Sequence, residues 1–252
     1  MTTSSRRLGD YLMLALAGVL GWGSLLLLGW FFYLGSLNLV DLSLADGAAL
    51  GLDACLCLLF FVQHSGMIRR PFRRWAGRFL PPHYQSAFYT IASAAALLLL
   101  LVFWQESTRV IVEIEGVARW LLRAVFILAV AGMAWGLIAL KADMLGLGPI
   151  RAHLRGREPS SIPFTVRGPY RWVRHPLYLF MLLLIWSCPY VTADRLLFNI
   201  TWTIWVVIGS VLEERDLIAE FGDTYRAYRR ETPMLIPLPV RRLGNRGGGA
   251  AA

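Results

Sequence analysis

The chain has 252 residues, of which 57% are hydrophobic and only 16% are charged. A soluble domain is typically about 45–50% apolar and about 25% charged, so this composition excludes a disordered chain and argues against a water-soluble globule. The formal net charge of +9 is compatible with nucleic-acid binding or with an asymmetric membrane topology. Cys55, Cys57 and Cys188 lie in apolar segments and are interpreted as small hydrophobic residues, because three cysteines are too few for a disulfide framework.

Long apolar segments predict six transmembrane helices, because about 20 apolar residues are needed to cross a bilayer. The expected spans are Tyr11–Gly35, Leu42–Gln63, Tyr84–Gln105, Ala124–Leu140 with an extension over Val117–Arg123, Pro176–Ala193 and Leu196–Leu212. The last two are expected to form a tight hairpin that turns at Asp194-Arg195. The sequence therefore predicts an all-α integral membrane protein, with a four-helix transmembrane region over residues 1–140, a functional region over 141–240 and a disordered tail over 241–252.

The basic residues are unevenly divided between the two sides of this topology. One side carries 21 of the 25 Lys and Arg residues, and the other carries only Arg109, Arg119, Arg123 and Arg195. The positive-inside rule places the richer side in the cytoplasm, so both termini are expected to be cytoplasmic. The cluster Arg69–Arg78 is expected to contact anionic lipid. Membrane topology thus accounts for the net charge, and no nucleic-acid partner is predicted.

The last third of the chain contains a polar constellation at two helix ends. His175-Pro176 opens the fifth expected span, and Pro176 suits the first turn of a helix because its missing N–H needs no partner there. Glu213-Glu214 closes the sixth, so the hairpin is expected to bring His175 and the glutamates together on the cytoplasmic face. Helix-start N–H groups favour anions, a carboxylate can hold an ammonium or ribose hydroxyls, and aromatic side chains can contact a purine. Simple anchoring of helix ends at the interface explains the same residues, and both interpretations stay open at this point.

A resemblance to a known family adds to this pattern. The residues that carry the resemblance are Arg174-His175-Pro176, Tyr178 and Glu213-Glu214, followed by Phe221–Tyr228 and Pro233–Pro237. Over about Ser161–Pro237 the chain resembles the isoprenylcysteine carboxyl methyltransferase superfamily. Its members, which include phospholipid methyltransferases, are integral-membrane enzymes that use S-adenosylmethionine (SAM). The resemblance implies a SAM site on the cytoplasmic face, formed by the last hairpin and the C-terminal segment. By position it carries cofactor binding over to Ile162, Pro163, Phe164, Thr165, Tyr170, His175, Pro176, Leu177, Tyr178 and Glu213, with Glu214 beside them.

Two further features of the sequence concern the methyl acceptor: a difference from the prenylcysteine enzymes, and a second resemblance. Prenylcysteine methyltransferases carry an arginine one turn before the glutamate, where this chain has Gly209, and the difference argues against a carboxyl acceptor. The first half of the chain resembles the bacterial methanethiol S-methyltransferases at Gln63–Met67, Arg70–Trp75 and Phe103–Gln105. That resemblance implies methylation of methanethiol to dimethyl sulfide, in the bacterial inner membrane.

The residues that serve the acceptor are predicted from the chemistry of thiols. A free thiol has a pKa near 8.5 and is mostly protonated at pH 7, so forming the nucleophilic thiolate requires a base. His64, at the cytoplasmic end of the second span, is a candidate base, and capping at the interface is the equal alternative. Glu214 is the second catalytic candidate. Asp53 is interpreted as a structural hydrogen-bonding group, and His83 and His153 as ordinary loop residues; no metal is expected.

The function hypothesis is a SAM-dependent membrane methyltransferase whose partners are a small thiol, most simply methanethiol, and membrane lipids. One alternative is methylation of a prenylcysteine carboxylate or a lipid headgroup. The other is a non-catalytic membrane sensor or carrier that keeps a SAM-like pocket. The sequence predicts no oligomeric state.

Overall fold

A computed structural model of the chain describes residues 3–158 and 164–238, with side chains from Arg7 onward. The elements are α1 (Thr3–Leu34), α2 (Asp46–Ile68), α3 (Arg70–Ala76), α4 (Pro82–Phe103), β1 (Val110–Glu113), α5 (Gly116–Leu140), α6 (Gly148–Leu154), the short 3-10 helix η1 (Gly168–Arg171), α7 (Pro176–Trp186), β2 (Tyr190–Thr192) and α8 (Ala193–Glu231). The tail expected at 241–252 lies outside the described residues, as do Ile162 and Pro163.

Five of the described helices are long and apolar enough to cross a membrane: α1, α2, α4, α5 and α8. Their outer surfaces carry large apolar side chains such as Leu26, Trp120 and Ile138, which are 70–74% exposed. A water-soluble protein rarely exposes apolar patches of this extent, whereas a lipid-facing surface requires them. The prediction of an all-α integral membrane protein is confirmed.

The fifth expected span is shorter than predicted. α7 contains 11 residues, about 16 Å at helical rise, which is roughly half the thickness of a bilayer core. After Trp186 the chain leaves the helix, passes through Pro189 and forms β2, which pairs antiparallel with β1 through Val110 and Thr192. Proline has no backbone N–H to donate and disfavours helix at the residue before it, so an uninterrupted span to Ala193 was the wrong prediction.

The predicted turn at Asp194-Arg195 is also wrong, because both residues belong to the first turn of α8. Both side chains are buried, and their hydrogen bonds connect the start of α8 to the ends of α4 and α1. The carboxylate of Asp194 accepts hydrogen bonds from Trp104 Nε1 at 2.9 Å and Ser107 N at 3.0 Å, and Arg195 donates to the carbonyls of Phe31 at 2.7 Å and Phe32 at 2.9 Å. Asp53 accepts from Gln105 N at 3.0 Å, which is the structural hydrogen bond expected of it.

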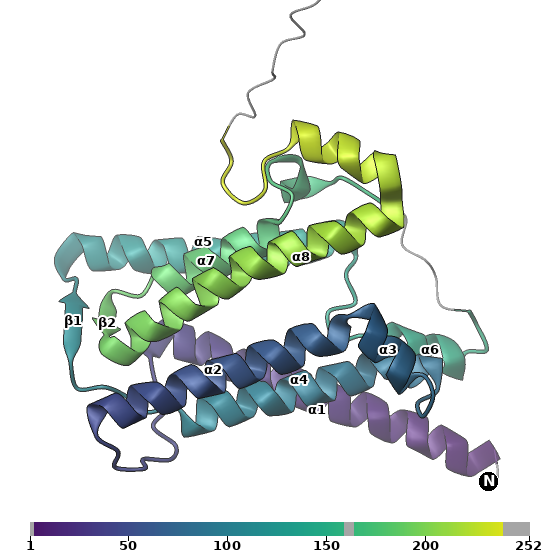
Figure 1. Ribbon diagram of the computed structural model, residues 1–252, viewed down its shortest axis with the longest axis horizontal. Coiled ribbons are helices and arrows are strands. Elements are labelled where there is room, and N and C mark those ends of the chain that lie inside the picture. The colour runs from purple at the N-terminus through teal and green to yellow at the C-terminus, as the bar shows by residue number, and fades with distance from the viewer. Residues whose placement is uncertain (1–2, 159–163, 239–252) are drawn as a thin grey trace, which may run out of the picture.

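The opposite end of the bundle holds the candidate site. Figure 1 places the start of α1, the bend of α8 and the short helices α3 and α6 at this end. We call it the basic end, because α3 carries Arg70, Arg73 and Arg74 there. α8 bends at Gly222, where φ is 55° and ψ is −128°, a conformation that side-chain-bearing residues avoid. The part of α8 beyond the bend folds back over the bundle (Figure 1), where its Tyr228 contacts Tyr170 of η1.

Candidate active site

A cavity of about 530 Å³ extends into the bundle from the basic end, and we call it the α8 cavity. Its volume lies within the range of about 300–1,000 Å³ that is usual for small-molecule sites. The polar residues that line it are Ser24, His64, Ser65, Arg69, Tyr89, Thr90, Ser93, Tyr178, Glu213, Asp216 and Glu220. Three of the predicted site residues, His64 of α2, Tyr178 of α7 and Glu213 of α8, therefore share one cavity.

The two adjacent glutamates face different surroundings, because successive helical residues point about 100° apart. The side chain of Glu213 is 46% exposed and lines the cavity. Glu214, with a side chain 6% exposed, points toward the C-terminal segment, where its Oε1 contacts Arg174 Nε at 2.7 Å and Nη2 at 2.6 Å. Its Oε2 lies 3.2 Å from Arg229 Nε. Glu214 therefore forms a charged clamp, and Glu213 is left available to a ligand.

Arg174 fastens the start of α7 to the segment that follows α8. Its guanidinium donates to the carbonyls of Arg229, at 3.0 Å, and Thr232, while its backbone N–H donates to Pro233 O at 2.9 Å. Arg174 was not among the predicted site residues. The sequence contained it within the Arg-His-Pro motif, but its pairing with Glu214 depends on a contact across 40 residues.

His175 lies between the two glutamates, as the hairpin predicted. Its Nδ1 is 3.7 Å from Glu213 Oε2, its Nε2 is 3.4 Å from Glu214 Oε1, and its ring stacks on Tyr178 with centroids 5.5 Å apart. Burial lowers the pKa of His175 below its usual range, and the neighbouring carboxylates only partly offset this effect. A neutral imidazole results, which can donate with one nitrogen and accept with the other.

The remaining described residues that were predicted to bind the cofactor lie outside the cavity lining. Phe164 packs against the rings of Phe221, Tyr225 and Tyr228, with centroids 5.3–5.9 Å apart. Tyr170 accepts a hydrogen bond on its carbonyl from Tyr228 Oη at 2.5 Å, and burial raises the pKa of its own phenol. Pro176 is buried as the first residue of α7, and Leu177 faces Gly136 of α5. Phe164, Thr165, Tyr170, Pro176 and Leu177 do not line the α8 cavity in the described part of the chain.

His64 projects into the cavity from α2 and is held by aromatic groups. Its ring stacks on Phe60 with centroids 5.1 Å apart, and Tyr89 Oη lies 3.1 Å from Nδ1 and 3.0 Å from Nε2. Tyr89, on α4, was not predicted from the sequence, because nothing local connects it with His64. Phe60 in turn stacks on Trp202 at 5.4 Å. The arrangement fixes the imidazole in a mainly apolar environment.

The charge of the cavity wall favours a cationic ligand. Glu213, Asp216 and Glu220 occupy positions i, i+3 and i+7 on one face of α8 and all line the cavity. Arg69 pairs with Asp216 at 2.5 Å, which leaves an excess of negative charge. Aromatic faces, here those of Tyr178 and residues of α2 and α8, also stabilise cations.

Comparison with known proteins gives relatives over most of the chain. It is 39% identical over 198 residues to methanethiol S-methyltransferase 2 of Bradyrhizobium diazoefficiens, an alignment that covers 76% of this chain and 74% of that protein. It is 38% identical over 197 residues to methanethiol S-methyltransferase of Mycobacterium tuberculosis, covering 77% and 81%. It is also 31% identical over 183 residues to nurim of Rattus norvegicus, covering 68% of each chain. No protein-family model and no solved structure matches the chain.

Proposed function

Because the chain belongs to the methanethiol S-methyltransferase family, we propose that it is a membrane methyltransferase that converts methanethiol to dimethyl sulfide. The observation that supports this reaction best is the α8 cavity, which brings Glu213 and Tyr178 on one wall together with His64 on another. A direct transfer between two bound molecules requires both to occupy one space in contact. The cavity provides that space.

The methyl donor is SAM, which supplies a methyl group on a positively charged sulfur. Methanethiol has two non-hydrogen atoms and is far too small to fill about 530 Å³, so a larger molecule shares the cavity. The negative wall around Glu213 suits the ammonium and sulfonium of SAM. His175 lies 3.7 Å from the Glu213 carboxylate and stacks on Tyr178, and the Arg174–Glu214 clamp holds the start of α7 in place.

The acceptor lies on the His64 side. His64 takes the proton of the thiol, the sulfur forms a bond to the methyl carbon, and the bond from that carbon to the donor sulfur breaks. The Tyr89 hydroxyl holds the imidazole during the proton transfer. The aromatic wall excludes water and aligns the reactants, which is the main contribution that a protein makes to such a displacement.

Gly209 supports a small acceptor over a prenylcysteine carboxylate. It lines the cavity beside Tyr178, and a β-carbon added there would lie 3.8 Å from the Tyr178 hydroxyl. No positive charge stands at this position to bind a carboxylate.

An acceptor panel with purified protein tests the proposed function. With SAM we expect dimethyl sulfide from methanethiol and no methylation of a prenylcysteine or of phosphatidylethanolamine. Methylation of one of the latter alone would establish the rival acceptor. Binding of SAM without transfer to any acceptor would indicate a sensor or carrier.

Variants of His64 and His175 test whether His64 serves the thiol and His175 serves SAM. His64→Ala should lower kcat by about 10²- to 10⁴-fold, as loss of a general base does, with little change in the dissociation constant of SAM. His175→Ala should weaken SAM binding more than it lowers kcat. Unchanged turnover in His64→Ala would leave proton removal to water or to Glu214.

The membrane orientation is part of the same proposal. The basic end faces the cytoplasm of a bacterial cell, both termini are cytoplasmic, and α3 contacts anionic lipid headgroups. Reporter fusions at Asn38 and Thr108, in the connections at the other end of the bundle, should report an external location. A cytoplasmic signal at either position would overturn the orientation.

A further inference from the structure

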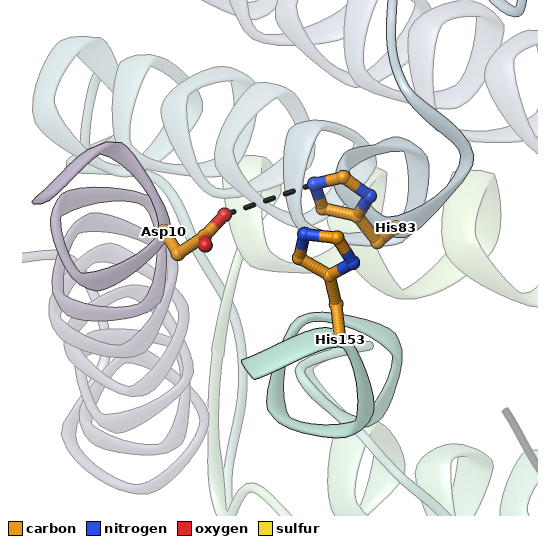
Figure 2. A group of neighbouring side chains, drawn as sticks. All are labelled: Asp10, His83 and His153. Atoms are coloured by element: carbon orange, nitrogen blue, oxygen red, sulfur yellow. Dashed lines mark ion pairs between the residues drawn. The ribbon is translucent and has the colours of Figure 1, made fainter. Parts of the chain in front are cut away.

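Three side chains from separate helices converge at the basic end, outside the α8 cavity. Asp10 comes from α1, His83 from the first turn of α4 and His153 from α6. Figure 2 shows the three side chains facing one another, and one potential ligand atom of each lies within 4.8 Å of the other two. The interpretation of His83 and His153 as loop residues was wrong, because both lie on helices.

The distances are close to those of a metal centre. Asp10 Oδ1 lies 3.7 Å from His83 Nε2, and the two imidazole rings are parallel within 5° with centroids 3.9 Å apart. Zinc binds nitrogen at about 2.0–2.1 Å and oxygen at about 2.0–2.2 Å, so two ligand atoms on a tetrahedral ion are roughly 3.3 Å apart. To bind one ion, the donor atoms must close from within 4.8 Å of one another to about 3.3 Å, and one imidazole must rotate out of the stack so that both in-plane lone pairs point at the ion.

The charge balance of the group also favours a cation. Asp10 is only 3% exposed, and burial of an unpaired carboxylate is costly. Tyr84 donates a hydrogen bond to its Oδ1 at 2.6 Å, which orients the carboxylate but supplies no charge. Among the described residues its one ion-pair partner is His83, and a proton placed there would bring positive charge against the stacked His153 ring. A metal ion neutralises Asp10 and accepts a lone pair from each imidazole.

We propose that Asp10, His83 and His153 bind a divalent transition-metal ion, Zn²⁺ by preference, with a fourth position left to water. Two imidazoles and one carboxylate favour such an ion over Ca²⁺ or Mg²⁺, which prefer sites made of oxygen alone. The Tyr84 hydroxyl is the outer partner that holds the coordinating carboxylate.

The position of the site gives the ion a structural role. α6 follows a segment whose Leu145 lines the α8 cavity, and Thr90 Oγ1 of α4 donates to Leu145 O at 2.8 Å. An ion at His153 fastens α6 to α1 and α4. It therefore stabilises one wall of the cavity without taking part in methyl transfer.

Titration of the metal-free, full-length protein with Co²⁺, followed by visible absorption and then displaced by Zn²⁺, tests this site. The protein must carry no histidine tag, and no SAM or thiol is needed. We expect one equivalent to bind, with a tetrahedral Co²⁺ spectrum. His83→Ala and His153→Ala should each weaken binding at least about tenfold, the loss of about 1.4 kcal/mol or more. His64→Ala and Cys55→Ser, which change a histidine and an exposed thiol elsewhere, should bind as the wild type does.

His153 is exposed, so its replacement leaves the fold intact, and Asp10→Asn keeps the hydrogen bond to Tyr84 while removing the charge. Zn²⁺ should raise the Tm of the wild type and of His64→Ala, but not of His153→Ala or Asp10→Asn. Absence of saturable binding to the wild type, or equal affinity in folded His153→Ala, would overturn the proposal and leave a stacked imidazole pair beside a carboxylate.

Discussion

Glu213 and Glu214 are adjacent in the sequence and opposite in their surroundings. Glu214 is buried and paired with the guanidinium groups of Arg174 and Arg229, whereas Glu213 is half exposed in the α8 cavity beside His175. Glu214 is buried between two cations and connects segments of the fold, whereas the position of Glu213 leaves its carboxylate accessible to a ligand. Sequence adjacency therefore does not imply a shared role.

The comparison bears on the catalytic role predicted for Glu214. The Glu214 carboxylate already accepts a hydrogen bond from Arg174 and lies against Arg229, so both of its oxygens face protein cations. Its position favours action through the Arg174-His175 turn. The catalytic role of Glu214 stays a prediction.

The largest effect is expected from breaking the clamp. Glu214→Ala leaves Arg174 buried without its anion, and removing one partner of a buried pair typically costs about 3–5 kcal/mol. The free energy of unfolding in detergent micelles should fall by about that amount. Asp223→Ala, which breaks the exposed pair with Arg226, is the control and should cost less than about 1 kcal/mol. Equal losses of unfolding free energy in the two variants would mean that the buried Glu214 pair contributes no more than an exposed ion pair, and would contradict the prediction.

The second effect concerns Glu213, the carboxylate that is proposed to bind SAM. Glu213→Ala should weaken binding of S-adenosylhomocysteine by about 10- to 150-fold, equivalent to about 1.5–3 kcal/mol for a hydrogen-bonded charge, and leave stability nearly unchanged. Glu213→Gln, which keeps hydrogen-bonding capacity, separates the charge from the hydrogen bond. Calorimetry that gives wild-type affinity for both folded variants would contradict the assignment.

The third effect is a pH dependence carried by His175, which contacts both glutamates. Burial lowers its pKa in the folded state, so the unfolded chain binds a proton more readily once the pH falls below about 6.5. Stability should therefore decrease on acidification from that pH, by at most about 1.4 kcal/mol per pH unit from this group. Denaturation at several pH values should show a smaller dependence in His175→Gln. A stability that rises toward pH 5 through His175 would reverse the sign and contradict the prediction.

The smallest effect is expected on the other wall of the cavity. Tyr89→Phe removes only the hydroxyl that contacts His64, and one hydrogen bond is worth about 0.5–1.5 kcal/mol. Turnover of methanethiol should fall about 2- to 13-fold. Tyr11→Phe, an exposed tyrosine on α1, is the matched control. A decrease as large as that of His64→Ala would indicate that Tyr89 itself takes part in the reaction.

The helices, and the placement of His175 beside Glu213, could be predicted because their signals are local. Apolar runs indicated the spans, and the Arg-His-Pro and Glu-Glu motifs indicated which hairpin carries His175 and Glu213. The strand that shortens α7 could not be predicted, because β2 depends on pairing with β1 about 80 residues earlier.

The partners of the site residues were missed for a similar reason. Tyr89 reaches His64 from another helix, and Arg174 meets Glu214 only because α8 continues past the hairpin and bends at Gly222. Such contacts are set by packing between distant segments. A single sequence carries no local pattern for them.

If one cavity holds both the methyl donor and the thiol, an isotope measurement tests this arrangement most directly. Purified protein is given methanethiol and SAM with a trideuterated methyl group, and the headspace is measured by mass spectrometry. The wild type and Gly209→Ala, whose added methyl has room, should form dimethyl sulfide with one labelled methyl and an equal amount of S-adenosylhomocysteine. Gly209→Trp, which places an indole in the cavity, should form almost none while remaining folded. Unlabelled dimethyl sulfide, or full activity in Gly209→Trp, would contradict the account.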